Sequence, residues 1–525
     1  MKQSVALTIC AAICACPGPS TEPILKDTAV TTDAGNLAPT DGGTIADTGT
    51  STDGGLSVDA GAIVDTGPEI VTGPWEVARR QAMVSSPRAF HVDDDGVLDV
   101  VIGRGVEFDS VGGVDAFSGA DGELLWSIDG DQEMVGTASP AELDGDEGLE
   151  LVIGGRDGEL HALDVETGDH IWRWSPYGQD GKDAGWFNFY TCQSLGDLND
   201  DLADEILCAN GGDSAIDPFQ PRPPGHLTIL SGADGSIYRS ATMPDEAETY
   251  MSPVVFHRAD GTLVIVFGSG GETLPGSLWW ITLTQFLNDG VTQAQEIVVP
   301  ANYRGAIAPP SLADLNGDGT DDVVVTFFDG QFLAIDGETG ESLWRLDELG
   351  METQASPAIC HFDQDGVPDV FASFARGNFP DWRGTVLKAV SSSGELLHRE
   401  ELEDLVIIST PLCMDLDGDG LDEVFLSANT GQQLEGGFGV PMPHFLFIMD
   451  PRNWSRRTWL EQQGMTFSTP MIIDLDGDGQ LELISARYQR QAGWRLARRD
   501  FEAVVPPQLT WPGYLGPLLN GRAYR

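Results

Sequence analysis

The nonapeptide DLNGDGTDD at Asp314–Asp322 is the clearest copy of a unit that recurs along the chain. The full copies alternate acidic or amide residues with other residues and end on Asp or Glu: HVDDDGVLD (His91–Asp99), ELDGDEGLE (Glu142–Glu150), DLNDDLADE (Asp197–Glu205), HFDQDGVPD (His361–Asp369), DLDGDGLDE (Asp415–Glu423) and DLDGDGQLE (Asp474–Glu482). An eighth segment, HRADG at His257–Gly261, is shortened and lacks the acidic spacing. A period of about 50 residues is typical of solenoids, propellers and other repeat arrays.

Apolar strands flank each acidic loop. A short strand that often opens with Ser-Pro or Thr-Pro precedes the loop, and an apolar strand such as VVVTFF (323–328) follows it. A tight turn then leads to a third strand and a second turn, as in AIDGETGESLW (Ala334–Trp344). Four short strands with Gly-rich turns and no helical periodicity are typical of a propeller blade. We therefore predict an all-β fold, a β-propeller of eight blades over residues 74–525. Seven blades, with one end unit completing a sheet across the ring seam, are the alternative.

The acidic loops have the chemistry of calcium sites. In D-x-D/N-x-D-G-x-x-D/E, the side chains at the first, third, fifth and ninth positions can turn inward together. The backbone carbonyl at the seventh position adds another oxygen, and Gly at the sixth allows the sharp turn. Hard oxygen ligands in this number suit Ca²⁺. An Asx-rich turn without an ion is the alternative for each loop.

This pattern resembles the calcium loop of FG-GAP (VCBS, integrin α-like) repeats, and the resemblance covers roughly residues 84–490. It implies several structural calcium ions. Three loops match best: Asp314, Asn316, Asp318, Asp322; Asp415, Asp417, Asp419, Glu423; and Asp474, Asp476, Asp478, Glu482. Two more fit without Gly at the sixth position: Asp197, Asn199, Asp201, Glu205; and Glu142, Asp144, Asp146, Glu150. Two begin with His, a poor calcium ligand, and offer Asp93, Asp95, Asp99 and Asp363, Asp365, Asp369. Three acids at the eighth position are expected to point outward: Asp204, Asp321 and Asp422.

A second resemblance concerns tryptophan. The segments ending at Trp126, Trp172 and Trp344 follow A-x-x-x-x-x-G-x-x-x-W, which is similar to the docking motif of PQQ-type quinoprotein propellers. That family binds a quinone on the ring axis, but this chain has no adjacent Cys-Cys pair to cover one, and His398 and Arg239 stand where Trp would be. We therefore expect these tryptophans to pack between blades and predict no quinone.

No catalytic set is recognisable in the sequence. It contains no G-x-S-x-G, no H-E-x-x-H and no phosphate loop. Four histidines are scattered singly, at His161, His226, His257 and His444. Calcium-bearing eight-bladed propellers include rhamnogalacturonan lyases, so a polysaccharide-active, lyase-like enzyme is the alternative function. A lyase would need a base and charge-neutralising groups around an acidic sugar.

Cysteines in the repeat region suggest one disulfide. Cys192 and Cys208 flank the same loop on adjacent antiparallel strands, so an oxidising compartment would favour their pairing; burial as free thiols is the alternative. Cys360 and Cys413 precede corresponding loops in neighbouring blades, where pairing is less favoured.

The start of the chain reads as a targeting segment. Residues 1–15 form a short signal peptide with an apolar run, and Ile13-Cys14-Ala15-Cys16 resembles a bacterial lipobox in which Cys16 is lipidated. An ordinary cleaved signal without lipid is the alternative. Residues 16–73 form a low-complexity acidic segment without aromatic residues before Trp75, which predicts a disordered linker. We expect a secreted lipoprotein of the outer membrane or cell surface, with a periplasm-facing anchor as the alternative.

The charge of the chain excludes some partners. Against 28 Lys and Arg stand 83 Asp and Glu, a formal net charge of −55 over 525 residues. Phosphate would be repelled, so DNA and RNA are not expected partners, and contact with a membrane is expected only through the lipid anchor. Seven arginines nevertheless gather after Ile484, and the last unit is predicted to close with AGWRLARRDF (492–501) and WPGYLG (Trp511–Gly516). This basic region is predicted to pair with an acidic ring, and an acidic-glycan site is the alternative.

Together these features predict a non-catalytic, calcium-stabilised propeller that mediates binding or adhesion to an extracellular glycan or protein, as a monomer. The sequence does not identify the ligand.

Overall fold

The structure is a computed structural model that describes residues 72–523, with gaps at 106–110, 147, 175–185, 214, 300–303, 379–381, 431–442, 490–492, 505–508 and 518–519. The signal peptide, Cys16 and all of the predicted linker before residue 72 lie outside the described residues. No helix among the described residues is long and apolar enough to cross a membrane.

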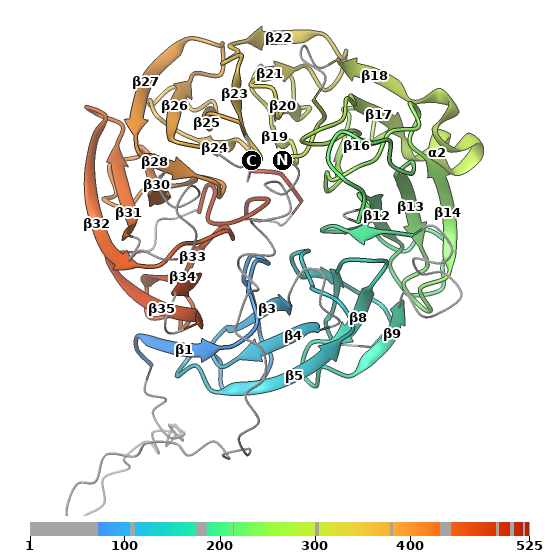
Figure 1. The fold of residues 1–525 in the computed structure, drawn as a ribbon, viewed down its shortest axis with the longest axis horizontal. Coiled ribbons are helices and arrows are strands. Elements are labelled where there is room, and N and C mark those ends of the chain that lie inside the picture. Colours follow the sequence, from blue (N-terminus) through green and yellow to red (C-terminus); the bar gives the residue numbers. More distant parts are fainter. Residues whose placement is uncertain are drawn as a thin grey trace, which may run out of the picture. The chain divides into compact units, whose positions relative to one another are not determined.

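Eight antiparallel sheets surround a common axis, as the view down that axis shows (Figure 1). Blades 1 and 2 contain β2 (Arg88–Phe90), β3 (Asp99–Gly105), β4 (Gly112–Phe117), β5 (Leu124–Gly130), and β6 (Ser139–Ala141), β7 (Glu150–Gly154), β8 (Leu160–Asp164), β9 (His170–Trp174). Blades 3 and 4 contain β10 (Asn188–Phe189), β11 (Gln193–Ser194), β12 (Ile206–Gly211), β13 (His226–Leu230), β14 (Ile237–Thr242), and β15 (Val254–His257), β16 (Leu263–Gly268), β17 (Leu278–Thr282), β18 (Gln295–Val298).

The second half repeats this plan. Blades 5 and 6 contain β19 (Ser311–Ala313), β20 (Asp322–Thr326), β21 (Phe332–Ile335), β22 (Ser342–Arg345), and β23 (Met351–Glu352), β24 (Ala358–Cys360), β25 (Asp369–Arg376), β26 (Gly384–Val390), β27 (Leu396–Glu403). Blades 7 and 8 contain β28 (Leu405–Ile407), β29 (Leu412–Met414), β30 (Glu423–Thr430), β31 (Pro443–Asp450), β32 (Ser455–Gln463), and β33 (Met471–Ile473), β34 (Gln480–Gln489), β35 (Gly493–Val504), β1 (Trp75–Arg79). The prediction of eight blades is confirmed.

The first strand closes the ring. β1 forms the outer edge of blade 8 and pairs antiparallel with β35, with Trp75 opposite Arg498. The first and last strands of the described chain thus pair within one sheet, which closes the ring of blades. Three arginines of this blade, Arg487, Arg495 and Arg499, surround Glu76 of β1, with the closest contact 2.6 Å from Arg487 Nη2 to Glu76 Oε2. The basic end therefore pairs in part with the chain's own first strand.

Tryptophans join the blades as expected. Trp126, Trp172 and Trp344 are each 8% exposed and donate from Nε1 to a carbonyl of the next blade, at Val165, Gly232 and Ser392. A glycine of the same neighbouring turn lies against each ring, and a Cβ at Gly168 would come within 2.8 Å of Trp126. In blade 6, where His398 stands in place of the motif tryptophan, its ring stacks on Trp454 of blade 7 with 4.7 Å between ring centroids.

Both cysteine pairs are bonded. Cys208 lies on β12 of blade 3 and Cys192 directly precedes the paired strand β11, with 4.6 Å between their Cα atoms. Cys360 and Cys413 also form a disulfide, so the expectation against their pairing is wrong. Inner strands of neighbouring blades converge at the axis, and residues one period apart therefore come within 5.4 Å between Cα atoms.

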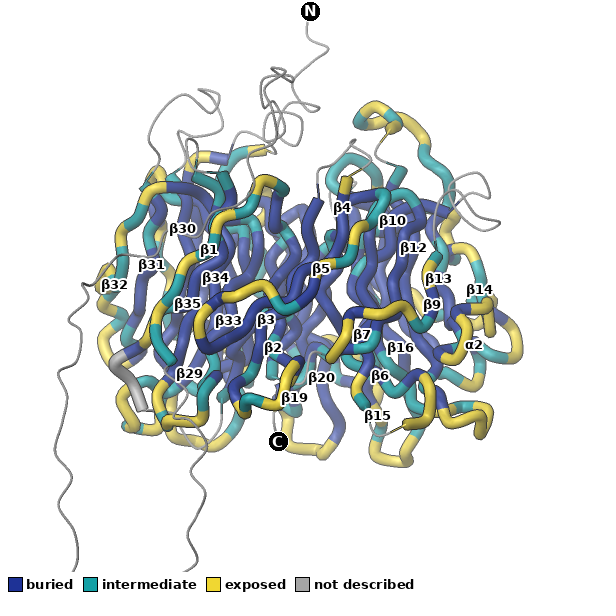
Figure 2. Tube along the Cα trace, turned by 90° about the horizontal axis from the view of Figure 1, so that it is seen from below, coloured by how far each residue is buried: buried dark blue, intermediate teal, exposed yellow. Residues whose placement is uncertain are grey.

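Blade 4 departs from the repeat. Between β17 and β18 it carries helix α2 (Leu283–Asp289), which begins at a capping box of Thr282 and Gln285, followed by the 3₁₀ turn η2 (Gly290–Gln293). Its shortened loop closes as a tight turn, with Arg258 N donating to Thr262 O at 3.0 Å. The side view in Figure 2 shows buried strands between exposed loops at both ends of the ring.

Residues 509–517 and 520–523, which we call the closing segment, follow the last strand but do not form a strand of the blade 8 sheet. Instead they run beside the inner strands near the axis. Trp511 exchanges backbone hydrogen bonds with Cys413, Pro512 accepts one from Ile472, and Ala523 donates one to Leu312. β1 already occupies the edge position of blade 8, so this segment remains available to line the axis.

Candidate functional site

The seven acidic loops share one hydrogen-bonding scheme. In each loop the ninth residue, at most 5% exposed, accepts a bond from the backbone N–H of the second residue, as Glu150 does from Leu143 at 2.7 Å and Asp322 from Leu315 at 2.9 Å. The fifth side chain accepts from the seventh N–H, as Asp318 does from Thr320 at 2.8 Å. The repeated sequence therefore folds into a repeated cradle of backbone and carboxylate hydrogen bonds.

Burial makes these ninth residues costly to ionise without a cation. Desolvation, reinforced by the neighbouring loop acids, raises the pKa of Glu150, Asp322, Glu423 and Glu482 to about 7. The same causes raise the pKa of Asp369 to about 6. A bound divalent cation would offset both the desolvation and the repulsion, because an opposite charge favours the ionised carboxylate.

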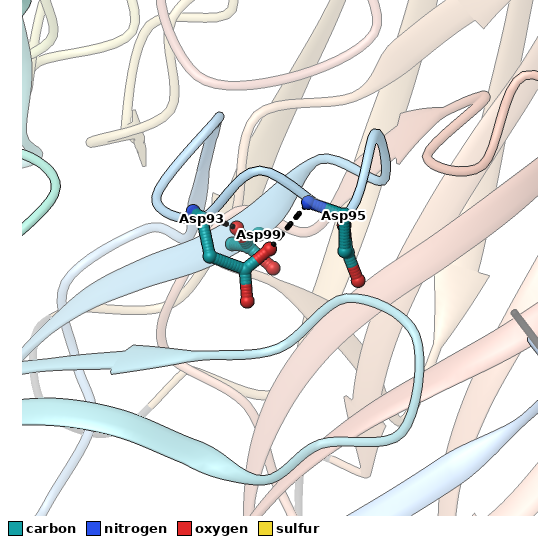
Figure 3. Close-up of side chains that lie close together, drawn as sticks. All are labelled: Asp93, Asp95 and Asp99. Carbon is teal, nitrogen blue, oxygen red and sulfur yellow. Dashed lines mark hydrogen bonds between the residues drawn. The ribbon is translucent and has the colours of Figure 1, made fainter. Parts of the chain in front are cut away.

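Carboxylates converge most closely in four loops. Ligand oxygens lie within 4.8 Å of one another in the sets Asp93, Asp95, Asp99; Glu142, Asp144, Glu150; Asp415, Asp417, Glu423; and Asp474, Asp476, Glu482. Figure 3 shows the first set: Asp93 N donates to Asp99 Oδ2 at 3.3 Å, and Asp95 N to Asp93 Oδ1 at 3.0 Å. The set in blade 1 belongs to a loop that begins with His91, so the unfavourable first residue does not prevent the acids from gathering.

Arginines reach into two of the loops that match the calcium pattern best. In blade 7 the exposed Arg452 contacts Asp417 Oδ2 at 2.7 Å and Asp419 Oδ2 at 2.9 Å. In blade 8 the buried Arg498 contacts Asp476 Oδ2 at 2.6 Å and Glu482 Oε1 at 3.4 Å. A guanidinium thus already balances part of the charge that an ion would neutralise. The sequence predicted these loops from their own residues and could not place an arginine from another strand or turn.

In other loops, asparagine or histidine side chains contact the carboxylates. Asn199 Nδ2 donates to Glu205 Oε1 at 2.6 Å in blade 3, and Asn316 Nδ2 to Asp336 Oδ2 at 3.1 Å in blade 5. In blade 6, His361 turns to Asp422 of the next blade, with 3.4 Å from its Nδ1 to Oδ2. The loops of blades 1 and 2 are the two convergent sets with no basic side chain paired to them among the described residues.

The eighth-position acids turn away from the loops, toward the preceding blade or the closing segment. Asp204 accepts from Glu142 N at 3.2 Å, Asp422 from His361 N at 2.7 Å, and Asp321 pairs with Arg522 at 2.5 Å. Asp204 and Asp422 therefore join blades, and Asp321 holds the closing segment. Asp321 and Asp422 are 2% and 3% exposed, so the expectation that they point outward is wrong.

A cavity of about 750 Å³ lies on the ring axis. Residues at or just before the inner strands of all eight blades line it: Ser86, Thr137, Thr191, Ser252, Pro309, Gln354, Thr410 and Thr469. The acidic loops follow the same strands, so the cavity and the loops lie at opposite ends of them. Hydroxyls join neighbouring blades around the cavity; for example, Thr469 Oγ1 accepts from Thr410 N at 3.1 Å and Ser86 Oγ from Thr469 N at 3.1 Å.

Arginines and aromatic residues form one wall of this cavity. Arg156, Arg222 and Arg304 line it together with Tyr190, Tyr250, Phe219 and Glu272. Burial raises the pKa of Glu272, and the neighbouring Glu248 carboxylate raises it further. Sequence reasoning missed this wall, because its residues come from connecting segments that lie outside the repeated pattern. The Ser-Pro and Thr-Pro strand openings were the one signal that pointed to the axis.

The cysteines of the described residues do not lie in the cavity. Its described lining contains no cysteine, and the two disulfides join strands instead of forming an adjacent pair. The PQQ-like tryptophans pack between blades, as described above. The resemblance therefore concerns how the blades are joined.

Comparisons with known proteins agree with this architecture. A family model described as outer membrane protein assembly factor BamB matches residues 74–201, which contain β1, blades 1 and 2 and the first strands of blade 3. Europium-containing methanol dehydrogenase superposes with a TM-score of 0.52 at 10% identity, covering 81% of this chain and 93% of that chain. Quinohemoprotein alcohol dehydrogenase from Comamonas testosteroni gives a TM-score of 0.50 at 12% identity, covering 84% and 78%.

BamB from Moraxella catarrhalis is also similar, with a TM-score of 0.45 at 12% identity, covering 81% of this chain and 98% of that chain. None of the curated proteins compared with the chain matches it. The comparisons support a BamB-like, PQQ-type repeat over residues 74–201 and the propeller fold. The resemblance to FG-GAP repeats stays a prediction.

Proposed function

We propose that this chain is a non-catalytic, calcium-stabilised propeller of the cell surface that binds an extracellular glycan or protein. The axial cavity carries the proposal. Its volume lies within the range of about 300–1,000 Å³ of small-ligand sites, and it joins aromatic faces to a few fixed polar groups. Nucleic acid is not among the proposed partners, because of the net charge of −55.

We propose calcium as the cation of the acidic loops, with a structural role. The supporting observations are the convergent oxygens and the buried ninth carboxylates. The geometry favours calcium binding in the loops of blades 1 and 2, because no arginine among the described residues is paired with their acids. Extracellular calcium modules often have Kd values of about 10⁻⁴–10⁻³ M, so external calcium would fill them.

We also propose attachment to the outer membrane through a lipid on Cys16, with the chain acting as a monomer. Two observations support attachment: the lipobox-like sequence and the match over residues 74–201 to a family named for outer membrane assembly. Replacing Cys16 by Ser should release the protein from membranes, and unchanged partition into the membrane fraction would refute lipidation.

A polysaccharide-active enzyme is the second candidate. Two acids support it: Glu272 lines the cavity, and Glu248 lies behind the wall, paired with Arg222. Glu248 Oε2 accepts from Arg222 Nη1 at 2.9 Å and from the Tyr250 hydroxyl at 3.0 Å. Desolvation raises the pKa of Glu248, as it does for Glu272. Acids with shifted pKa values in a cavity are candidates for proton transfer.

One pair of experiments separates the two functions. A glycan and protein array probed with the calcium-loaded protein should show saturable binding, and acidic and neutral polysaccharides should yield neither new reducing ends nor unsaturated products. Robust turnover that Glu272→Gln abolishes would replace the binding function with the enzymatic one. If the protein binds no glycan or protein on the array, the proposed binding function is refuted.

A further inference from the structure

We infer that the axial cavity takes the carboxylate-bearing end of an extracellular glycan chain. This inference rests on the proposed binding function and names the part of the ligand that enters. Three features support it. The wall arginines are held by buried carboxylates, the lining hydroxyl groups already accept hydrogen bonds and can donate their protons, and the closing segment lies at one end of the cavity.

The wall arginines are held in place from behind. Arg156 Nε contacts Glu133 Oε2 at 2.6 Å, Arg222 contacts Glu248, and Arg304 Nη2 contacts Glu352 Oε1 at 3.4 Å. The anchoring carboxylates are buried, with at most 4% exposure: Glu133, Glu248 and Glu352. Arg222 uses Nη1 on Glu248 and Tyr250 and Nη2 on the Ile216 carbonyl, so it contributes mainly positive charge. A guanidinium oriented by a buried carboxylate can match a ligand carboxylate through N–H donors.

Arg222 is the most deeply placed of the three arginines, with a side chain 8% exposed. Its Nε has no hydrogen-bond partner, although the atom is buried. Arg304 lies 5.9 Å from the ring centroids of both Phe219 and Phe328, which orient its guanidinium plane. The wall therefore offers oriented cations beside aromatic surface, in a protein that is otherwise strongly acidic.

The hydroxyl lining adds further donors. Ser86 and Thr469 each accept a backbone N–H, so their own protons remain for donation to an oxygen. Ser409 also lines the cavity, is 3% exposed, and its Oγ has no partner in the described structure. These hydroxyl protons add donors to the arginine wall, beside the Glu272 carboxylate, and such donors suit a ligand rich in oxygen acceptors, such as an acidic sugar.

The closing segment blocks the cavity at the end toward the acidic loops. Tyr514 lines the cavity, and its hydroxyl lies 3.3 Å from Ser252 Oγ. Its carbonyl accepts a hydrogen bond from the buried Arg88, and the preceding Trp511 is bonded to Cys413. A glycan chain that enters from the opposite end would meet this segment, so a chain end or a short branch fits the cavity better than a chain that threads through it.

The test uses the whole calcium-loaded protein and isothermal titration calorimetry. The probes are trigalacturonate, trimannuronate and a hyaluronan tetrasaccharide, with cellotriose and maltotriose as neutral counterparts. At least one acidic probe should bind one to one, at least about tenfold more tightly than the neutral probes, a difference of about 1.4 kcal/mol. A long polymer of the same sugar should bind one protein per chain end.

Variants locate the site. Arg304→Gln should weaken binding of the acidic probe at least about tenfold, and Ser409→Val, which fills space without removing a charge, should weaken it as well. Arg345→Gln, on the outer strand β22, is the matched control and should bind normally. Melting curves verify that each variant is folded.

Three results would overturn the inference: no acidic probe binds, neutral probes bind equally well, or many proteins occupy one long polymer chain. Unchanged affinity in both cavity variants would overturn it too. In each case a positive glycan or protein array would leave the broader binding function standing, so the two failures can be told apart.

Discussion

The loops of blades 2 and 8 have the same backbone scheme and opposite means of charge balance. In both, the ninth carboxylate is buried and accepts the second N–H at 2.7 Å, at Glu150 and Glu482. Blade 8 inserts Arg498 among its acids, whereas the blade 2 acids have no paired basic side chain in the described structure. The nonapeptide therefore specifies the hydrogen-bonding scheme of the loop, and the surrounding strands decide whether an arginine pairs with its acids.

The largest effect is expected for Arg498→Met. The variant leaves Asp476 and Glu482, whose side chains are 4% and 2% exposed, without their cation. Loss of one partner of a buried pair costs about 3–5 kcal/mol. We expect this loss in the free energy of unfolding in EGTA, measured by denaturant titration.

Calcium should restore much of that stability and bind in one additional equivalent, counted by elemental analysis after dialysis. Arg495→Met is the control, because Arg495 is 3.5 Å from Glu76 and touches no loop acid. An unchanged number of bound ions in Arg498→Met would show that blade 8 cannot hold calcium even without its arginine.

The second effect concerns calcium removal. If blades 1 and 2 hold the ions, each site contributes about 2.7 kcal/mol at a calcium concentration a hundred times its Kd. EGTA should therefore lower the melting temperature of the native protein. Glu150→Gln should reduce this calcium-dependent shift, whereas Asp474→Asn in blade 8 should leave it unchanged. Equal reductions in both variants would refute the distinction between the two loops.

The third effect concerns a buried histidine that titrates separately from the loop carboxylates. His444 in blade 7 is 1% exposed, hydrogen-bonds to Ser427 Oγ at 2.9 Å, and burial lowers its pKa to about 3. Below pH 6.5 the unfolded chain takes up a proton on this histidine that the folded protein does not. Stability should therefore fall by about 1.4 kcal/mol per pH unit, or roughly 2 kcal/mol at pH 5.

Urea unfolding at pH 7 and pH 5, with calcium present, measures this loss. His444→Gln keeps a polar side chain and cannot titrate, so its stability should fall less than that of the native protein between the two pH values. A parallel fall in both proteins would place the pH sensitivity elsewhere, for example in the loop carboxylates.

The local parts of this structure could be predicted from the sequence, and the parts that depend on contacts between blades could not. The acidic nonapeptides and their flanking strands repeat within about 50 residues, so their hydrogen-bonding scheme is encoded locally. Arg498 reaches its loop across paired strands, and Cys360 meets Cys413 only because inner strands converge. The cavity arginines lie in connections of unequal length, where no periodic signal exists.

The smallest effect on stability, and the sharpest on affinity, is expected for Arg452→Gln. Arg452 is 46% exposed and bridges Asp417, Asp419 and Asp450 at the surface of blade 7. Exposed ion pairs contribute little to stability, so the melting temperature in EGTA should stay the same. The freed acids should then bind calcium more tightly than in the native protein, and titration calorimetry should show one more site or a stronger one. If calcium binding is unchanged, the blade 7 loop either already holds an ion beside Arg452 or is too open to hold one. Glu423→Gln, which removes the buried ninth carboxylate, separates these two explanations. The variant should lose a bound ion only if the loop was already filled.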